Sequence, residues 1–467
     1  MAKFLHIVPG LFEALIGRLN IEDTEMVIAQ YNINNRAVGE LKPYKGNART
    51  HSKKQIQQIA KSIEKFGFNN PVLVADDDTI IAGHGRVAAA ELIGLPEVPT
   101  IRLSHLNVAD RRAYVLADNK LAENAGWDTE LLAFEIQSLL DLDFDLSLTG
   151  FESIEIDRVL DDWAEASTTA NDLPEDCVPP LSSPIVSKLG DVWHLGQHRL
   201  MCGDARNHDH LAVLLAGETV DIIFTDPPYN VRIDGHVCGL GKTHHREFAM
   251  ASGEMTRSEF VTFLSVTLSN ASGACRDGAI AYVCMDWRHI GELLEAGMTA
   301  FDEFKNLCVW NKGNGGMGAF YRSKHELIFV FKKGTAKHVN NFGLGEGGRY
   351  RTNVWDYPGI SSIGSTRSEE LAMHPTVKPV ELVADALRDC SRRGDIVLDI
   401  FGGSGSTLIA AQKCGRKARV VEFDPAYCDT IIRRFTSLSG KPVTLLRSGA
   451  TFEELESQLA GGGKLDG

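Results

Sequence analysis

The tetrapeptide Asp226-Pro227-Pro228-Tyr229 has the residue types needed to hold a reacting amino group. It directly follows the apolar run 220–224, which predicts a buried strand, and prolines are disfavoured inside a strand because they cannot donate to its ladder. After the strand they form a stiff loop with carbonyl acceptors. The exocyclic amino group of a nucleobase is a poor nucleophile, since its lone pair is delocalised into the ring. Acceptors on both N–H bonds, such as the Asp226 carboxylate and the Pro227 carbonyl, favour the form that attacks, and Tyr229 is suited to stack on the base.

A second candidate site is the glycine-rich segment 399–406, which leaves one predicted strand (396–400) and enters a predicted helix (407–414). In a doubly wound fold, ligands bind at the carboxyl ends of strands, and glycines let the backbone come close to them. Glu422 ends the next predicted strand (417–421), where a carboxylate can accept hydrogen bonds from a ribose. No lysine follows the glycines, which argues against a nucleoside-triphosphate P-loop. The segment alone leaves dinucleotide binding open.

A third candidate is the turn Gly83-His84-Gly85-Arg86, between a short predicted strand (79–82) and a predicted helix (87–93). A glycine turn that enters a helix favours an anion, because unpaired N–H groups and the helix dipole both point at it. Arg86 adds a charge, so we expect a phosphate site at Gly83 and Arg86.

Apolar periodicity predicts the elements that must position these residues. In the first third of the chain it predicts a helix over 53–66 and a strand over 71–74. Further along, strands alternate with helices, which predicts an α/β, doubly wound, Rossmann-like domain. The remaining elements expected there are strands 279–283 and 327–331 and helices 260–271 and 381–390.

The chain has 467 residues, more than the roughly 100–200 of a typical single domain, so we expect several. A segment rich in Pro, Ser, Thr and Asn near 165–185 is typical of an exposed linker, and a terminal Gly-Gly-Gly is typical of a flexible tail. The expected divisions are an N-terminal extension (1–34), a small α+β domain (35–125), an acidic helical region (126–165), the linker (166–185), the doubly wound domain (186–450) and the tail (451–467).

The net charge of −14 is unevenly distributed. Residues 141–180 hold twelve acidic residues against Arg158 alone, whereas residues 305–351 hold nine basic residues against two acidic ones. A local basic face matters more for nucleic-acid binding than the global charge, although a charge cluster can also be a solvated surface. The candidate DNA-binding residues in this segment are Lys312, Arg322, Lys324, Lys332, Lys333, Arg349 and Arg351.

Composition limits the other classes of function. No apolar run of about 18 residues exists, so we expect no membrane span, and the first ten residues do not resemble a secretory signal. The nine cysteines lack the close spacing of zinc ligands, which favours free thiols in a reducing cytoplasm and no metal. Cys238 with His244 and His245 is a weaker metal alternative.

The first two sites together resemble the S-adenosylmethionine-dependent amino-methyltransferases of DNA, over roughly residues 186–440. In that family D-P-P-Y is the catalytic motif, and an F-x-G-x-G loop holds the cofactor. The segment 374–379 (His-Pro-Thr-Val-Lys-Pro) is similar to the family's H-P-T-x-K-P, and 202–205 looks like its G-D motif. The resemblance implies catalytic Asp226, Pro227, Pro228 and Tyr229, and cofactor contacts at Asp204, Thr376, Lys378, Pro379, Asp399, Phe401, Gly403, Ser404, Gly405 and Glu422.

The catalytic half precedes the cofactor half, which is the permuted order of the family's beta class. In that class target recognition falls between the halves, where the basic segment 305–351 lies. D-P-P-Y usually accompanies methylation of adenine N6, and S-P-P-Y that of cytosine N4. The resemblance therefore implies a site-specific adenine methyltransferase that acts on a flipped-out base in double-stranded DNA, with N4-cytosine as the alternative.

Residues 35–125 resemble a ParB-like nuclease fold through the segments 47–52 and 83–89. In chromosome-segregation relatives the second motif is closer to G-E-R-R-x-R-A and holds a nucleotide's phosphates. Gly83, Arg86 and Ala89 correspond to it, but His84 replaces the glutamate, and Gly85 and Ala88 replace two arginines. Positioning on DNA is therefore the expected role, ahead of nucleotide hydrolysis or DNA cleavage, and a purely structural remnant is the alternative.

Two other readings of the chain stay open at this stage. One is a methyltransferase of RNA or of a protein glutamine, although the N-P-P-Y enzymes of that kind usually place the cofactor loop first. The other is a non-catalytic DNA-binding protein in which the ParB-like domain does the work. A homodimer and a partner restriction endonuclease are both compatible with the resemblance.

Overall fold

The computed structural model describes residues 31–142, 144–167, 174–231, 253–313, 321–342, 349–359 and 377–461. The chain divides into two compact units. The N-terminal unit comprises Met1–Asp128 with Ser138–Phe151, and the C-terminal unit comprises Thr129–Gln137 with Glu152–Gly467.

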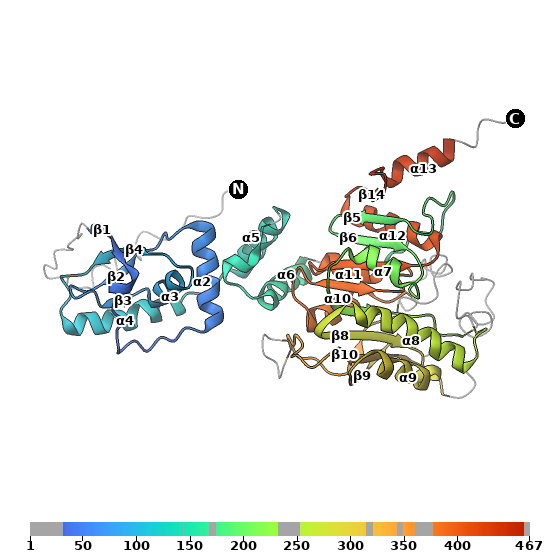
Figure 1. Ribbon diagram of the computed structural model, residues 1–467, viewed down its shortest axis with the longest axis horizontal. Helices are drawn as coiled ribbons and strands as arrows, with labels where there is room; N and C mark the ends of the chain where they lie inside the picture. The colour runs from blue at the N-terminus through green and yellow to red at the C-terminus, as the bar shows by residue number, and fades with distance from the viewer. Residues whose placement is uncertain are drawn as a thin grey trace, which may run out of the picture. The chain divides into compact units, whose positions relative to one another are not determined.

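The N-terminal unit is built on a four-stranded sheet with the order β1-β4-β2-β3 (Figure 1). Apolar side chains of the sheet and of the helix after β3 form its core, among them Val72, Ile80, Val87 and Val98. The unit's elements are β1 (Ile33–Ala37), η1 (Val38–Glu40), α2 (Lys53–Phe66), β2 (Val72–Val74), β3 (Ile80–Ala82), α3 (His84–Leu92), β4 (Glu97–Arg102), α4 (Val108–Glu123) and η2 (Leu146–Thr149). Helix α5 (Thr129–Asp141) runs across the division between the units.

The C-terminal unit is built on a ten-stranded sheet with the order β11-β9-β10-β8-β7-β12-β13-β6-β5-β14. Its strands are β5 (Val192–Leu195), β6 (His198–Cys202), β7 (Val220–Thr225), β8 (Cys275–Met285), β9 (Glu303–Asn311), β10 (His325–Lys332), β11 (Val354–Asp356), β12 (Ile396–Asp399), β13 (Lys417–Glu422) and β14 (Val443–Leu445). Its helices are α6 (Ser153–Ser167), η3 (Pro174–Asp176), α7 (His208–Leu215), α8 (Arg257–Gly273), η4 (Trp287–His289), α9 (Ile290–Ala300), α10 (Val380–Cys390), α11 (Ser406–Lys413), α12 (Pro425–Ser439) and α13 (Phe452–Gly461).

The middle of this sheet is parallel, from β8 through β7, β12 and β13 to β6. Strand β10 runs antiparallel to both β8 and β9. The carboxyl ends of the parallel strands, the amino end of β10 and the carboxyl end of β9 therefore lie along one edge of the sheet. Loops at the carboxyl edge of such a sheet are the usual place for a ligand.

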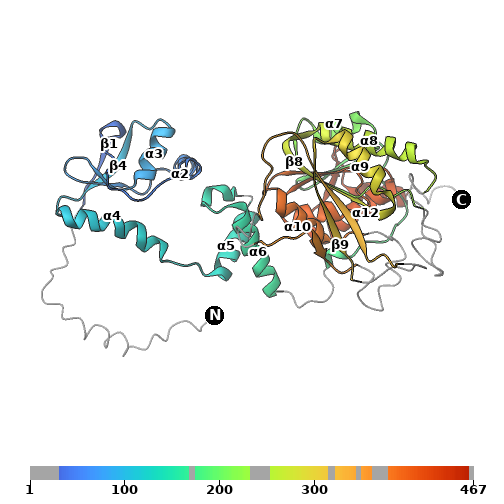
Figure 2. The ribbon, with the colours of Figure 1, turned by 90° about the horizontal axis from the view of Figure 1, so that it is seen from below.

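Two apolar cores lie on the two faces of the sheet, and Figures 1 and 2 show the helices that cover these faces. One core contains side chains of α10, α11 and α12, and the other contains side chains of α7, α8 and α9. This is the layered arrangement of a doubly wound domain, so the predicted fold class is confirmed. Each predicted strand and helix of this domain is present, with ends that move by a few residues.

Parts of the segments expected as linker and tail contact the sheet domain. Glu175 accepts a hydrogen bond from Lys413 Nζ at 2.6 Å, and Asp176 accepts one from the Val380 backbone N–H at 2.9 Å. The segment from 174 onward is thus bonded to the sheet domain rather than free. In the expected tail, residues 452–461 form α13, because Phe452 is buried against Trp193 with ring centroids 5.5 Å apart.

Within the part of the chain that the structure describes, no helix is both long and apolar enough to cross a membrane. The cysteines among the described residues are unbridged. Cys238, His244 and His245, the weaker metal alternative, lie outside the described residues.

Candidate active site

The tetrapeptide predicted to be catalytic, 226–229, and the glycine loop lie at the carboxyl ends of two neighbouring parallel strands, β7 and β12. The last residue of β7, Thr225, donates its hydroxyl to Asp399 Oδ1 at 2.8 Å, and Asp399 ends β12. The same carboxylate oxygen accepts the Phe401 backbone N–H at 3.0 Å. A buried side-chain hydrogen bond therefore fixes the spacing between the two motifs.

Asp226 follows the carboxyl end of β7, and both of its carboxylate oxygens accept hydrogen bonds. Tyr229 donates its hydroxyl to Oδ1 at 2.6 Å, and Lys378 donates its ammonium to Oδ2 at 2.5 Å. Lys378 also lies 5.5 Å from the centroid of the Tyr229 ring. We expected Lys378 to contact the cofactor, but its ammonium contacts the D-P-P-Y motif. Its backbone carbonyl, however, accepts the Ser406 hydroxyl at the start of α11.

Glu326 is a further member of this cluster that the sequence analysis did not single out. It is the second residue of β10, its side chain is 9% exposed, and it lies 2.9 Å from Lys378 Nζ. Lys312, which follows β9, forms a second ion pair with it. The signal in the sequence was a lone carboxylate at the start of an otherwise apolar strand. Only the antiparallel direction of β10 brings that carboxylate to the catalytic edge.

The charges of this cluster shift one another's pKa values. Burial raises the pKa of Asp226, Lys378 lowers it and Glu326 raises it, and the net result lies above the usual value. Burial acts in the same direction on Glu326, but Lys378 and Lys312 bring its pKa below the usual value. Burial lowers the pKa of Lys378, yet the two carboxylates outweigh it and hold the ammonium charged.

Asn230 holds the D-P-P-Y loop in place from its far side. It has a positive φ of 51°, which asparagine tolerates better than most residues. Its side-chain carbonyl accepts the backbone N–H groups of Gly253 and Met255 at 3.0 and 3.2 Å, and its amide donates to the Met255 carbonyl at 2.9 Å. The loop is therefore tied to the residues that precede α8.

The glycine loop has little room for any side chain. A Cβ on Gly402 would lie 2.5 Å from Val420 Cγ1, and Gly405 has a φ of 86° at the N-cap of α11. Arg434 donates to the Ser404 backbone carbonyl at 2.8 Å and fixes the turn from behind. This packing explains the glycines at 402 and 405, in a loop that follows the carboxyl end of β12.

Glu422 and Asp204 lie beside this loop at the ends of β13 and β6. The Gly203 N–H donates to the Glu422 backbone carbonyl at 2.8 Å, which places the two predicted residues side by side. Glu422 also accepts the Gly403 and Asp424 N–H groups at 2.7 and 2.8 Å. Burial raises the pKa of Glu422 to about 7 and that of Asp399 to about 7. Asp204 is held by Arg206 at 2.7 Å.

The predicted cofactor contacts thus come together on adjacent strand ends. The half-buried carboxylate of Glu422 and the glycine cradle at 402–405 fit the ribose and the close backbone approach of S-adenosylmethionine. Phe401 lies nearby, packed on Phe263 with centroids 5.8 Å apart. Pro379 is the N-cap of α10. Thr376, with the rest of the segment 374–376, lies outside the described residues.

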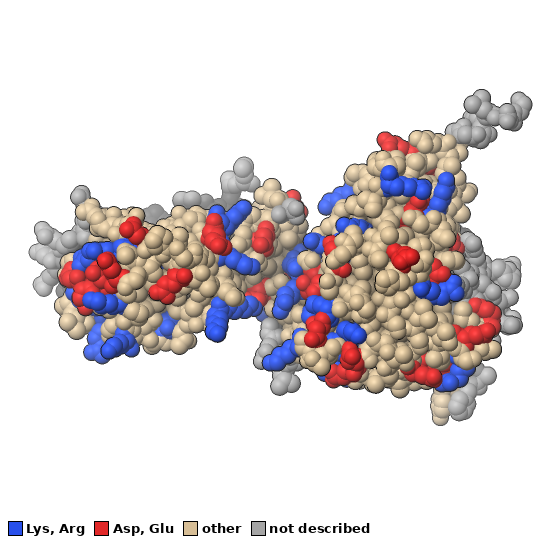
Figure 3. Space-filling view, in the orientation of Figure 1, with Lys and Arg blue, Asp and Glu red and all other residues tan. Residues whose placement is uncertain are grey.

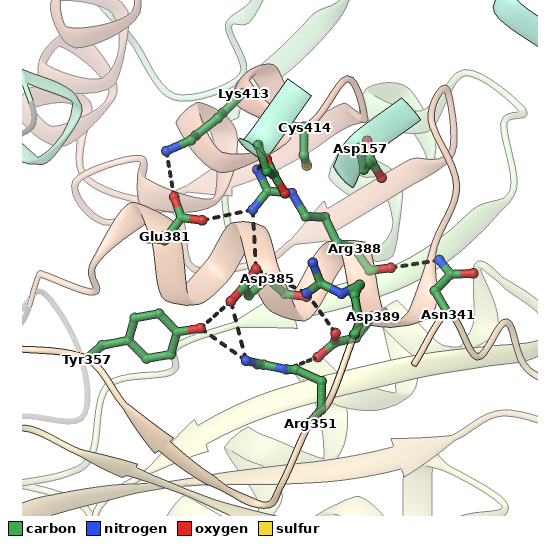
Figure 4. A network of polar contacts seen from close by, with 12 residues as sticks. Asp157, Asn341, Arg351, Tyr357, Glu381, Asp385, Arg388, Asp389, Lys413 and Cys414 are labelled. Carbon is green, nitrogen blue, oxygen red and sulfur yellow. Dashed lines mark hydrogen bonds and ion pairs between the residues drawn. The ribbon is translucent and has the colours of Figure 1, made fainter. Parts of the chain in front are cut away.

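Arg349 and Arg351, predicted to contact DNA, both pair with acidic residues of the domain, and Figure 4 shows Arg351 beside Asp385 and Asp389. Their side chains are 15% and 16% exposed and form ion pairs with Asp385 and Asp389 of α10. The Tyr357 hydroxyl also donates to Asp385. These contacts attach the segment 349–357 to α10, so they give the two arginines a structural role that a DNA contact would have to disrupt.

The other predicted DNA-binding residues differ in their surroundings. Lys312 belongs to the Glu326 cluster, Lys332 is buried beside Glu303, and Lys333 lies 3.5 Å from Asp302. Arg322 and Lys324 are exposed and precede β10 at the catalytic edge. On the face of the described residues shown in Figure 3, basic and acidic side chains are interspersed.

The two ParB-like segments meet in one small pocket of the N-terminal unit. Its volume is about 130 Å³, and it is lined by Asn47, Arg49, His51, His84 and Arg86 among others. Gly83 caps α3 with a φ of 104°. Arg86 donates to the Pro71 carbonyl at 3.2 Å, and its Nε is buried with no hydrogen-bond partner among the described residues. An unsatisfied buried guanidinium atom in such a pocket favours an anion.

Three family models match the chain. Residues 220–433 match the model described as DNA methylase. Residues 23–120 match the ParB N-terminal domain, and residues 130–189 match the ParB-methyltransferase HTH domain. The last match covers most of the region that we had divided into an acidic helical region and a linker.

Three curated proteins illustrate both halves of the chain. The ParB-like nuclease domain-containing protein YnaK of Escherichia coli (strain K12) is 54% identical over 71 residues, which is 15% of this chain and 82% of that protein. The type II methyltransferase M.HinfI of Haemophilus influenzae is 24% identical over 49% of this chain and 66% of its own length. The DNA adenine methyltransferase YhdJ of Escherichia coli (strain K12) is 25% identical over 48% of this chain and 80% of its own length.

Proposed function

Since this chain belongs to the N6/N4 DNA methylases and carries a ParB N-terminal domain ahead of its methylase domain, we propose that it methylates the N6 amino group of adenine in double-stranded DNA. The observation that carries the proposal is the hydrogen bond from Thr225 to Asp399, which fixes the D-P-P-Y motif beside the cofactor loop. Methyl donor and acceptor therefore meet at adjacent strand ends.

The residues of the chain act on the amino group in a simple sequence. The target base leaves the helix, at a cost of a few kcal/mol, and enters the pocket at Asp226–Tyr229. The Asp226 carboxylate and the Pro227 carbonyl accept hydrogen bonds from the two N–H groups of the target amino group. These hydrogen bonds localise the lone pair on the nitrogen. The glycine loop and Glu422 would hold S-adenosylmethionine, which would supply the methyl group to the nitrogen while sulfur keeps the electron pair of the broken bond. Asp226 then takes the proton that the methylated nitrogen releases, so the catalysis is positioning and polar stabilisation.

Adenine is the proposed base because the motif begins with Asp226 and because YhdJ is a DNA adenine methyltransferase. Cytosine N4 is the alternative within the same family. DNA from cells that express the protein, digested to nucleosides and analysed by mass spectrometry, separates the two. N6-methyladenine supports the proposal, and N4-methylcytosine alone contradicts it.

Replacing Asp226 with Ala tests the catalytic assignment. The variant loses the acceptor for the amino group, so transfer of labelled methyl groups to duplex DNA should fall by at least about a thousandfold. Binding of S-adenosylmethionine, measured by calorimetry, should stay within about threefold of wild type, because Glu422 and the glycine loop are untouched. Methyl transfer by the variant at nearly the wild-type rate would reject the assignment. If the wild-type protein itself does not bind S-adenosylmethionine, a non-catalytic ParB-like DNA-binding protein is favoured instead.

We assign DNA contacts first to Arg322 and Lys324, because both are exposed at the edge that carries Asp226. The pocket at Gly83 and Arg86 is proposed to take a phosphate while the N-terminal unit positions the protein on DNA. A second copy of the chain and a restriction endonuclease are the partners that the family relationship suggests, and light scattering and co-purification test them.

A further inference from the structure

The Lys378 ammonium is shared between two carboxylates inside the catalytic cluster. It lies 2.5 Å from Asp226 Oδ2 and 2.9 Å from Glu326 Oε2, and its side chain is 4% exposed. Glu326 is reached by the Tyr229 hydroxyl as well, at 3.3 Å. The two donors to Asp226, Lys378 and Tyr229, thus have Glu326 as a second acceptor within reach.

This sharing matters because Asp226 has no carboxylate oxygen without a donor. Tyr229 occupies Oδ1 and Lys378 occupies Oδ2. An incoming amino group must therefore replace one of these donors before Asp226 can accept its N–H bond. If the buried Lys378 ammonium moved away from Asp226 and no other anion lay nearby, it would be an unpaired buried charge with a large desolvation cost. Glu326 removes that cost for Lys378.

The remaining charged groups keep the cluster balanced. Lys312 pairs with Glu326 from the outer side, with its own side chain 32% exposed. The other titratable groups that act on this cluster are the Tyr229 hydroxyl, the Cys284 thiol and the Asp399 carboxyl, besides Lys378 and Glu326. Two ammonium groups thus face two carboxylates, Asp226 and Glu326, in a site that is largely closed to water.

We propose that Glu326 is a positioning residue for methyl transfer: it accepts the Lys378 ammonium when the target amino group takes that ammonium's place on Asp226. The inference rests on the proposed function for the identity of the incoming group. Lys378 thereby acts as a movable counter-ion, which pairs with Asp226 before the base arrives and turns toward Glu326 afterwards. Lys312 holds Glu326 in the position to receive it.

The test compares Glu326→Gln, Glu326→Asp and Lys378→Gln in the full chain. Single-turnover transfer of tritiated methyl groups to unmethylated genomic DNA is measured from pH 5.5 to 9.5. Glu295→Gln is the matched control, because Glu295 pairs with Arg257 on the exposed side of α9, away from the site. Circular dichroism checks that each variant is folded.

We expect Glu326→Gln to lower the transfer rate about tenfold or more, with little change in the concentration of DNA that half-saturates it. Without the Glu326 charge, the Asp226 carboxylate is easier to ionise, so the acid limb of the pH profile should move to lower pH by about one unit. Lys378→Gln should move the same limb to higher pH, because it removes the cation. Glu326→Asp should keep the wild-type limb and recover part of the rate, whereas a merely structural role predicts no opposite shifts. The inference would be overturned if Glu326→Gln left the acid limb of the pH profile unchanged and the transfer rate within twofold of wild type.

A readout without turnover separates this inference from the proposed function. Carbon-13 NMR of carboxyl-labelled aspartate, with the Asp226 signal assigned by its loss in Asp226→Asn, gives the titration midpoint directly. A lower midpoint in Glu326→Gln supports the charge coupling even if no methyl group reaches DNA, an outcome that would reject the proposed function alone. An unchanged midpoint in a protein that methylates DNA normally would reject the inference alone.

Discussion

The acidic residues of the cofactor edge combine burial with several hydrogen bonds. Glu422 and Asp399 both have pKa values of about 7, because burial disfavours their charged forms. Backbone N–H groups partly offset that effect, with Gly403 and Asp424 donating to Glu422. These carboxyls consequently change protonation near neutral pH, where exposed carboxyls stay ionised.

This pKa predicts a pH dependence of cofactor binding. The ionised form of Glu422 is the better acceptor for ribose hydroxyls and the better neighbour for a sulfonium. The affinity for S-adenosylmethionine should therefore rise between pH 6 and pH 8, by about three- to tenfold for one titrating group. Calorimetry across this range measures it, with Glu422→Gln expected to bind more weakly and without the pH dependence. An affinity that is flat with pH in the wild-type protein would contradict the assignment.

At the scale of elements, the loop between β12 and α11 depends on contact with the next strand. Gly402 lies against Val420 of β13, and its backbone N–H donates to the Val421 carbonyl at 2.9 Å. Val420 is fully buried in a parallel strand, so it cannot give way at low cost. The position of the cofactor loop is thus set by how closely it packs on β13.

Gly402→Ala should therefore disturb the loop more than the size of a methyl group suggests. Overpacking of this kind costs about 1–3 kcal/mol of stability, and we expect the affinity for S-adenosylmethionine to fall about tenfold or more. Chemical denaturation and calorimetry provide the two measurements. Gly291→Ala in α9 is the control, because a Cβ there meets no atom within 4 Å, and it should stabilise the protein by roughly 0.5–1 kcal/mol. Equal behaviour of the two variants would mean that the loop adapts freely.

At the scale of the whole molecule, the acidic helix α6 belongs with the methylase domain. Asp157, 4% exposed, forms ion pairs of 2.8 Å with Arg416 and with Arg393. Asp161 forms one of 2.7 Å with Arg388, and burial raises the pKa of Asp161 to about 6. The acidic segment that dominated the net charge therefore neutralises basic residues of the domain that follows it.

Two truncations test this division. A chain of residues 129–467 keeps Asp157 and Asp161, whereas residues 174–467 would leave Arg416, which is fully buried, without its carboxylate. Breaking a buried ion pair by removing one partner typically costs about 3–5 kcal/mol, so the shorter chain should be less stable by at least that amount. Urea unfolding of the two chains gives the difference. If the two chains were equally stable, the methylase domain would begin near 165–185, after α6.

The sequence by itself determined the chemistry of the site and the parallel core. Asp226 to Tyr229, the glycine loop and Glu422 were recognisable because each follows an apolar strand, and strand ends in such a fold share one edge. Helix α2 was predicted over its full range from its apolar periodicity, and in the structure it begins after the Ser52 N-cap and ends at Gly67. Local signals of this kind need no knowledge of distant residues.

Only the tertiary structure decided the roles of residues whose partners are remote in sequence. Glu326 reaches the catalytic cluster because β10 runs antiparallel, and strand direction is set by pairing rather than by local sequence. In the sequence Arg349 and Arg351 belong to a basic segment, and the structure shows that they pair with Asp385 and Asp389 of α10. Asp157 was counted in the sequence only as part of an acidic segment, and its partner Arg416 lies 259 residues away along the chain. The sequence shows the sign of each charged residue, but the function of that residue depends on which opposite charge the fold places beside it.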